Sequence, residues 1–200
     1  MPEIQRPPRD ITPSGFFETW LPAQAAGLGA ATPFTVRVRL DGDGGGAWDL
    51  RLGPAGLAVA APGPSEAEPE ATIVQSVADW RAIAVGEPGQ VDLAPPQARP
   101  TDVLFLDAAA QQIVRQVAGA IRFEVTGYNG RTWALLVKLG PKPLDAERPD
   151  ATISVDAETY AAMLARTLPP PAAYFQGKIR ISGDMQIAMQ IAMALMPRFS

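Results

Sequence analysis

The feature that most constrains the fold is a pattern that occurs twice along the chain. Each occurrence starts with two runs of alternating apolar and polar residues joined by a glycine-rich turn, which is typical of a β-hairpin. The hairpins cover residues 34–52 and 121–137. An Ala-Thr-Ile tripeptide then begins a short strand, and a capping residue, Ser76 or Asp156, begins a helix. The shared order, at a spacing of about 80 residues, favours internal duplication over the chance similarity of short hairpins.

A proline-rich stretch over residues 87–100 is the best candidate for a linker between the two copies. It predicts two units, residues 1–100 and residues 101–200. Because strands and helices alternate with many glycine and proline turns, we expect an α+β protein made of two similar units.

The composition excludes most familiar enzyme mechanisms. The chain has no cysteine and no histidine, which removes disulfides, thiol nucleophiles, imidazole bases and most nitrogen or sulfur metal sites. We therefore expect a protein that is not an enzyme and needs no metal or cofactor. The net charge of −4 and the absence of a basic block also argue against nucleic acid as a partner.

Three polar motifs have simple structural explanations. The glycine-rich run 41–46 lacks the ligands of a calcium loop and precedes a strand-like run, so we interpret it as a hairpin tip. The acidic residues between 145 and 158 fall in a loop and at a helix start, where carboxylates stay solvated. Ser182 or Asp184 is expected to cap the last helix, because no histidine could activate a serine nucleophile.

The last helix is the most informative segment. Four methionines form one stripe along it, and Ile187, Ile191 and Leu195 form another. The apolar run over residues 185–196 is too short to span a bilayer, so we expect no stable membrane anchor. A helix that is apolar over most of its circumference has to be covered by a packed core, a partner subunit or an apolar ligand. The sequence leaves these three open.

Residues 174–189 (YFQGKIRISGDMQIAM) resemble the closing signature of the sterol carrier protein 2 family. An aromatic residue there precedes a glycine, a strand of alternating basic and apolar residues, a Gly-Asp turn and an apolar helix. The resemblance extends over about residues 105–200, and residues 16–100 are similar to a degenerate second copy. The chain does not end in the peroxisomal Ser-Lys-Leu signal, and its charged, proline-rich start predicts no export signal, so we expect a cytoplasmic location.

The resemblance implies two sterol-carrier-like units, each a mostly antiparallel sheet of about five strands layered with helices around an apolar tunnel. It implies non-catalytic binding and transfer of a lipid, a fatty acid, a sterol-like ligand or another long apolar molecule. The alternative is a protein-interaction or scaffold module that uses the methionine-rich helix as its interface, which allows a homodimer. The residues expected to line the ligand site are Phe123, Val125, Trp133, Leu135, Ile153, Met163, Phe175, Ile179, Ile181, Met185, Met189, Met193 and Met196.

Overall fold

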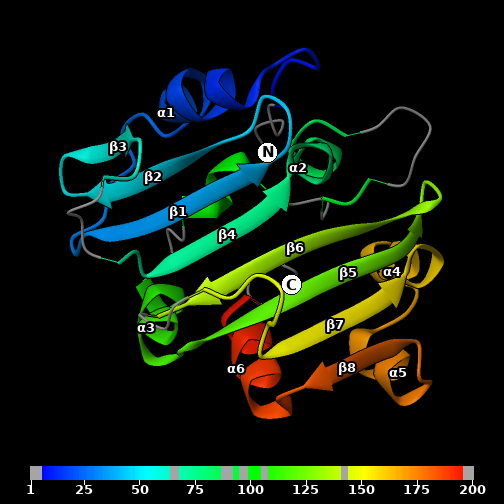
Figure 1. The fold of residues 1–200 in the computed structure, drawn as a ribbon. Coiled ribbons are helices and arrows are strands. Elements are labelled where there is room, and N and C mark those ends of the chain that lie inside the picture. The colour runs from blue at the N-terminus through cyan, green and yellow to red at the C-terminus, as the bar shows by residue number, and fades with distance from the viewer. Residues whose placement is uncertain are drawn as a thin grey trace.

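Eight strands form one continuous mixed sheet in the computed structural model, which describes residues 6–63, 68–86, 92–94, 99–104, 108–140 and 144–195. The strand order is β3-β2-β1-β4-β6-β5-β7-β8 (Figure 1). The strands are β1 (Phe34–Asp41), β2 (Gly46–Gly53), β3 (Gly56–Ala60), β4 (Ala71–Ser76), β5 (Gly119–Tyr128), β6 (Arg131–Leu139), β7 (Ala151–Asp156) and β8 (Ile179–Gly183). Both hairpins and both Ala-Thr-Ile strands expected from the sequence are present.

Most helices bury their apolar side chains against one face of this sheet. The helices are η1 (Gly15–Trp20), α1 (Leu21–Gln24), α2 (Val77–Ala84), η2 (Pro100–Leu104), α3 (Ala108–Gln116), α4 (Ala157–Leu164), α5 (Pro170–Phe175) and α6 (Met185–Leu195). Phe16 and Phe17 of η1, Trp80 of α2, Leu104 of η2, Val114 of α3 and Ala188 of α6 belong to a single buried core with the sheet. The chain is therefore an α+β protein with helices layered on a mixed sheet.

The two halves use the same strand register. In each half the first hairpin strand pairs antiparallel with its partner and parallel with the Ala-Thr-Ile strand. Thr72 lies beside Arg37 in the first half, and Thr152 lies beside Arg122 in the second. Residues 71–73 thus pair with 36–38, and residues 151–153 with 121–123.

The two halves join through a pair of strands that belong to different halves. β4 pairs antiparallel with β6, with Ala71 opposite Leu139 and Ile73 opposite Val137. The two sheets expected, one in each half, are therefore joined into one continuous sheet, because an edge strand of one half completes its hydrogen bonds on an edge strand of the other. With β4 and β6 counted in both halves, each half has a five-stranded sheet.

The segment between the halves is not a detached linker. Leu93 is only 1% exposed and packs with Ala82, Val125 and Trp133. Its backbone carbonyl oxygen accepts a hydrogen bond from Tyr160 Oη at 2.8 Å. The described part of the proline-rich stretch is thus anchored in the core.

Candidate functional site

The helix-covered face of the C-terminal half carries its apolar side chains in rows that cross the strands. Directly paired residues in neighbouring strands share a face, so the register defines each row. Two rows are mostly buried, namely Trp133, Val125 and Val155 in one, and Val137, Ile121 and Ala151 in the other. The row between them consists of Leu135, Phe123, Ile153 and Ile181, and all four are only half-buried. We call this row the apolar strip.

Different helices cover the two rows that flank the apolar strip. Tyr160 and Met163 of α4, together with Leu93, pack against the row that contains Trp133. Val114 of α3 and Ala188 of α6 belong to the core with the other row. The strip therefore lies between two helix-bearing clusters and is less completely covered than either flanking row.

The two polar side-chain groups beside the strip, on Trp133 and Tyr160, donate hydrogen bonds to backbone carbonyl oxygens. Trp133 Nε1 donates a hydrogen bond to the backbone carbonyl oxygen of Asp79 at 2.8 Å. Burial and, secondarily, the negative charge of Asp92 raise the pKa of the Tyr160 hydroxyl to about 12. Tyr160 is therefore neutral at physiological pH and donates to Leu93. These two side chains can line an apolar site without presenting a charge to it.

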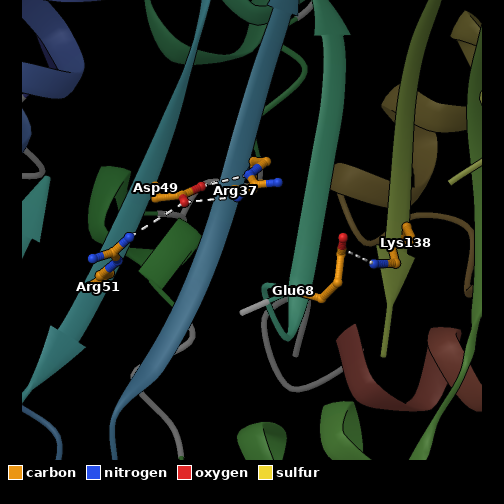
Figure 2. Close-up of polar contacts among 5 residues, drawn as sticks. All are labelled: Arg37, Asp49, Arg51, Glu68 and Lys138. Atoms are coloured by element: carbon orange, nitrogen blue, oxygen red, sulfur yellow. Dashed lines mark hydrogen bonds and ion pairs between the residues drawn. The ribbon is translucent and has the colours of Figure 1, made fainter. Parts of the chain in front are cut away.

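The opposite face of the sheet carries the charges (Figure 2). Arg37 Nε and Nη2 donate to the two carboxylate oxygens of Asp49 at 2.7 and 2.9 Å, and Arg51 approaches the same carboxylate at 3.7 Å. Farther along the sheet, Lys138 Nζ lies 3.4 Å from Glu68 Oε2. A long apolar ligand would therefore favour the helix-covered face.

Two hollows lie away from the strip. One, of about 570 Å³, is lined by residues of η1, β2 and β3, including Glu18 and Trp48. The other, of about 160 Å³, is on the charged face and includes Gln75 and Arg122. Neither is lined by any of the thirteen residues expected at the ligand site, so the enclosed tunnel stays a prediction.

The structure brings together eight of the thirteen expected residues. Seven share the helix-covered face and the eighth comes from α4: Phe123, Val125, Trp133, Leu135, Ile153, Ile179, Ile181 and Met163.

The other expected residues lie elsewhere. Phe175 is 86% exposed on α5, and Met185 and Met189 are 44% and 52% exposed on α6. The side chain of Met193, and Met196 as a whole, lie outside the described residues. About half of the surface of Met185 and of Met189 thus faces solvent.

Sequence reasoning missed the inward-facing residues of α6. Ile187 packs against the core, near Gly119 of β5, and Ala188 is fully buried. The signal for Ile187 was the second apolar stripe of the same helix, which has the same period as the methionine stripe, and Ala188 lies next to it. Leu93 and Tyr160 were also missed, since nothing local marks a leucine in a proline-rich stretch as buried.

Neither a metal centre nor a membrane span is found in the described ranges. No three acidic, histidine or cysteine side chains gather there as ion ligands would. None of the helices described is both long and apolar enough to cross a bilayer.

Comparison with known families gives a match over the half that contains the strip. The model of the SCP-2 sterol transfer family matches residues 101–196. The C-terminal half of the chain belongs to this family. The match begins in η2 and includes all four strands of the SCP-2 domain, β5 to β8.

Relatives of the SCP-2 domain occur within longer proteins. Human sterol carrier protein 2 is 32% identical over 92 residues, which are 43% of this chain. Rat hydroxysteroid dehydrogenase-like protein 2 is 30% identical over 89 residues, which are 42% of this chain. This chain spans only 17% of the length of either relative.

Two solved structures of the family are also similar. The crystal structure of sterol carrier protein 2 like 2 from Aedes aegypti is 28% identical, with a TM-score of 0.31, over 40% of this chain and 75% of that one. The solution structure of sterol carrier protein domain 2 of Helicoverpa armigera is 24% identical, with a TM-score of 0.35, over 51% of this chain and 93% of that one.

Proposed function

We propose that the SCP-2 domain binds one long apolar molecule, such as a lipid acyl chain, along the apolar strip and carries it without chemical change. The observation that carries this proposal is the half-burial of Leu135, Phe123, Ile153 and Ile181 between two buried rows. Large apolar side chains on a helix-covered face are normally fully buried. A row that the helices leave partly exposed can therefore be covered by an apolar ligand.

The size and energetics of the strip suit such a ligand. Four neighbouring strands place its ends about 14 Å apart. Each methylene group removed from water contributes about 0.8 kcal/mol, so a chain of about ten methylenes can offset the cost of association. Because no charged side chain lies in the strip, we expect weak discrimination between chains of different length.

One wall of the proposed site is the apolar cluster around α4. Met163 and Tyr160 there, with Trp133, pack beside the strip, and Met163 can adapt to a guest because its side chain is unbranched and flexible. Met185 and Met189 could contact a guest only after a shift of α6, since they now face outward. Their role as a movable wall stays a prediction, as does that of Phe175.

We propose that the N-terminal half is a degenerate copy of the SCP-2 domain that has lost its ligand site. The shared strand register of the two halves supports the duplication. In the N-terminal half an aromatic cluster fills the helix-covered face: the Phe17 ring stacks on Trp48 at 4.7 Å, and Phe16 contacts Trp80 at 5.3 Å. Trp48 and Val38 are buried as a result, so the helix-covered face of this half has no row that is half-buried throughout, as the apolar strip is.

Ligand loading tests the proposed function. Native mass spectrometry of the purified protein should show copurified lipid, and a fluorescent fatty acid should bind. Ile153→Asn should weaken its binding by about tenfold or more, because it places an amide in the strip. Leu57→Asn is the matched control, since Leu57 is also half-buried on the same face but lies on β3. Protein that carries no lipid and takes up no fatty acid would contradict the proposal.

A further inference from the structure

The larger of the two hollows combines a carboxylate with an indole ring. It lies in the N-terminal half and has a volume of about 570 Å³. Its lining comes from η1 and the residue before it, and from the residues around the start of β2 and the end of β3. α1 continues from η1 beside β3 (Figure 1). Most of the lining residues are glycine, alanine or valine, and Glu18 is the one charged residue among those described there. We call this space the η1 hollow.

The η1 hollow is not the N-terminal counterpart of the apolar strip. The shared register places Val38 where the other half has Phe123, and Trp48 where it has Leu135. Trp48 therefore fills the corresponding row itself, and it is only 4% exposed. The hollow lies between Trp48, η1 and the end of β3, so a ligand in it would not occupy the strip.

Trp48 holds the Glu18 carboxylate in one position. Trp48 Nε1 donates a hydrogen bond to Glu18 Oε1 at 2.8 Å, and the indole ring is itself stacked on Phe17. No basic side chain in the described part of the chain forms an ion pair with Glu18, and its Oε2 accepts no hydrogen bond there. The hollow thus contains a negative charge with a fixed position and without a counter-charge.

The lining suits an organic cation better than a metal ion. Ca²⁺ and Mg²⁺ take about six or more oxygen ligands, and no three acidic side chains gather anywhere in the described ranges. A protonated amine needs only a carboxylate and a few further acceptors. The β2–β3 pairing ends with Asp49 opposite Ala60. The first residues of β2, which line the hollow, therefore have backbone groups that β3 does not pair.

We propose that the η1 hollow binds a small organic cation, namely an amine with an apolar body. The ammonium group donates to Glu18 Oε2, and the apolar body packs against Trp48 and Val59. The volume of about 570 Å³ is within the range of small-molecule sites, about 300 to 1,000 Å³. The proposal assigns a second site to the protein and does not depend on the ligand proposed for the apolar strip.

A titration with three compounds of the same shape tests the charge. The probes are 2-phenylethylamine, which is a cation at neutral pH, 2-phenylethanol, which is neutral, and phenylacetate, which is an anion. Calorimetry gives the affinities, and the assigned ¹H–¹⁵N signal of the Trp48 indole reports binding beside Glu18. We expect the amine to shift this signal and to bind about tenfold or more tightly than the alcohol, because its hydrogen bond to Glu18 is charge-assisted. Phenylacetate should bind most weakly.

A variant of Glu18 tests the assigned group. Glu18→Gln keeps an oxygen that can accept from Trp48 Nε1 but removes the charge, so the amine should bind about tenfold more weakly, at the level of the alcohol. The charge-matched control is Glu158→Gln, which changes an exposed residue on α4 and should leave the amine affinity at the wild-type value.

Three results would overturn the proposal. One is a Trp48 indole signal that the amine does not shift. Another is equal affinity for the three probes, or an amine affinity that Glu18→Gln leaves unchanged. The third is displacement of a bound fluorescent fatty acid by the amine, which would place the amine on the apolar strip. Fatty-acid binding by Glu18→Gln should equal that of the wild type, because the two sites lie in different halves of the sheet.

Discussion

Tyr160 on α4 donates its hydroxyl hydrogen to the backbone carbonyl oxygen of Leu93, with the two oxygens 2.8 Å apart. The bond ties the segment between the two halves to the core beside the proposed site. Replacing Tyr160 with Phe removes it and leaves a carbonyl oxygen without this donor. We expect a loss of about 1 kcal/mol in the free energy of unfolding at neutral pH, measured by urea denaturation.

The raised pKa of Tyr160 predicts that the protein becomes less stable at alkaline pH. The pKa of Tyr160 is about 12 in the folded protein and about 10 in an unfolded chain. Because the unfolded state loses this proton first, the stability falls as the pH rises from about 10 to about 12, by about 1.4 kcal/mol per pH unit. Tyr160→Phe should lack this component. Parallel stability curves for wild type and variant above pH 10 would contradict the assignment.

The two helix caps should respond differently to acid. Asp156 Oδ1 accepts the Thr159 N–H at 2.8 Å, and Ser76 Oγ accepts the Asp79 N–H at 3.0 Å. The Thr159 N–H and then its hydroxyl lower the pKa of Asp156 below 3.8. Each cap replaced by Ala should cost about 1 kcal/mol at neutral pH.

The contribution of Asp156 is present above its unfolded pKa and is lost as the pH falls through its lower folded pKa. The cost of Asp156→Ala should therefore shrink in acid, and by more than the cost of Ser76→Ala, the control, whose hydroxyl also donates to Asp79 Oδ2 at 2.9 Å. Urea denaturation from neutral pH downward measures both. An equal decline for the two variants would argue against the assigned role.

Two glycines with similar backbone angles, Gly177 and Gly183, should differ in how much an alanine substitution destabilises the protein. Gly177 has φ 71° and Gly183 has φ 86°, so alanine is strained at both, by about 1 kcal/mol. A Cβ on Gly183 would lie 2.3 Å from the backbone oxygen of Asp150, whereas one on Gly177 would meet nothing within 4 Å. Gly183→Ala should cost about 2 kcal/mol more than Gly177→Ala, because β7 and β8 would have to move apart. Thermal denaturation of both variants decides this.

On the charged face, Asp49 forms two ion pairs that should contribute very differently to stability, one with Arg37 and one with Arg51. Arg37→Ala should cost about 3 kcal/mol, because Asp49 is 1% exposed and loses two short hydrogen bonds. Arg51→Ala should cost about 1 kcal/mol or less, since Arg51 is 41% exposed and lies 3.7 Å from the same carboxylate. Equal losses in urea denaturation would mean that the two arginines share the carboxylate evenly.

Local sequence patterns predicted the elements well and their assembly less well. Alternation identified both hairpins, and the capping residues Ser76 and Asp156 identified the helix starts, because hydrogen bonds within a few residues decide these features. The pairing of β4 with β6 carries no local signal. Ile73 and Val137 are ordinary apolar strand residues, and nothing in either strand names its neighbour.

In the candidate site, too, the local features were predictable from the sequence and the packing of one element on another was not. The residues on β5 to β8 were found because alternation assigns a face, and seven of them share it. The orientation of α6 was not predictable in this way. A helix that is apolar over most of its circumference has two stripes of equal period, so periodicity alone does not tell whether Met189 or Ala188 faces inward.

The ladder between β4 and β6 has a consequence for motion. Proteins built from two domains usually bend where few contacts cross between them. Here the strand pairing runs without interruption from β3 to β8, so the described part of the chain has no hinge between the two halves. Because the continuous sheet prevents the two halves from moving apart, a ligand would have to enter by displacement of the helices that cover the sheet.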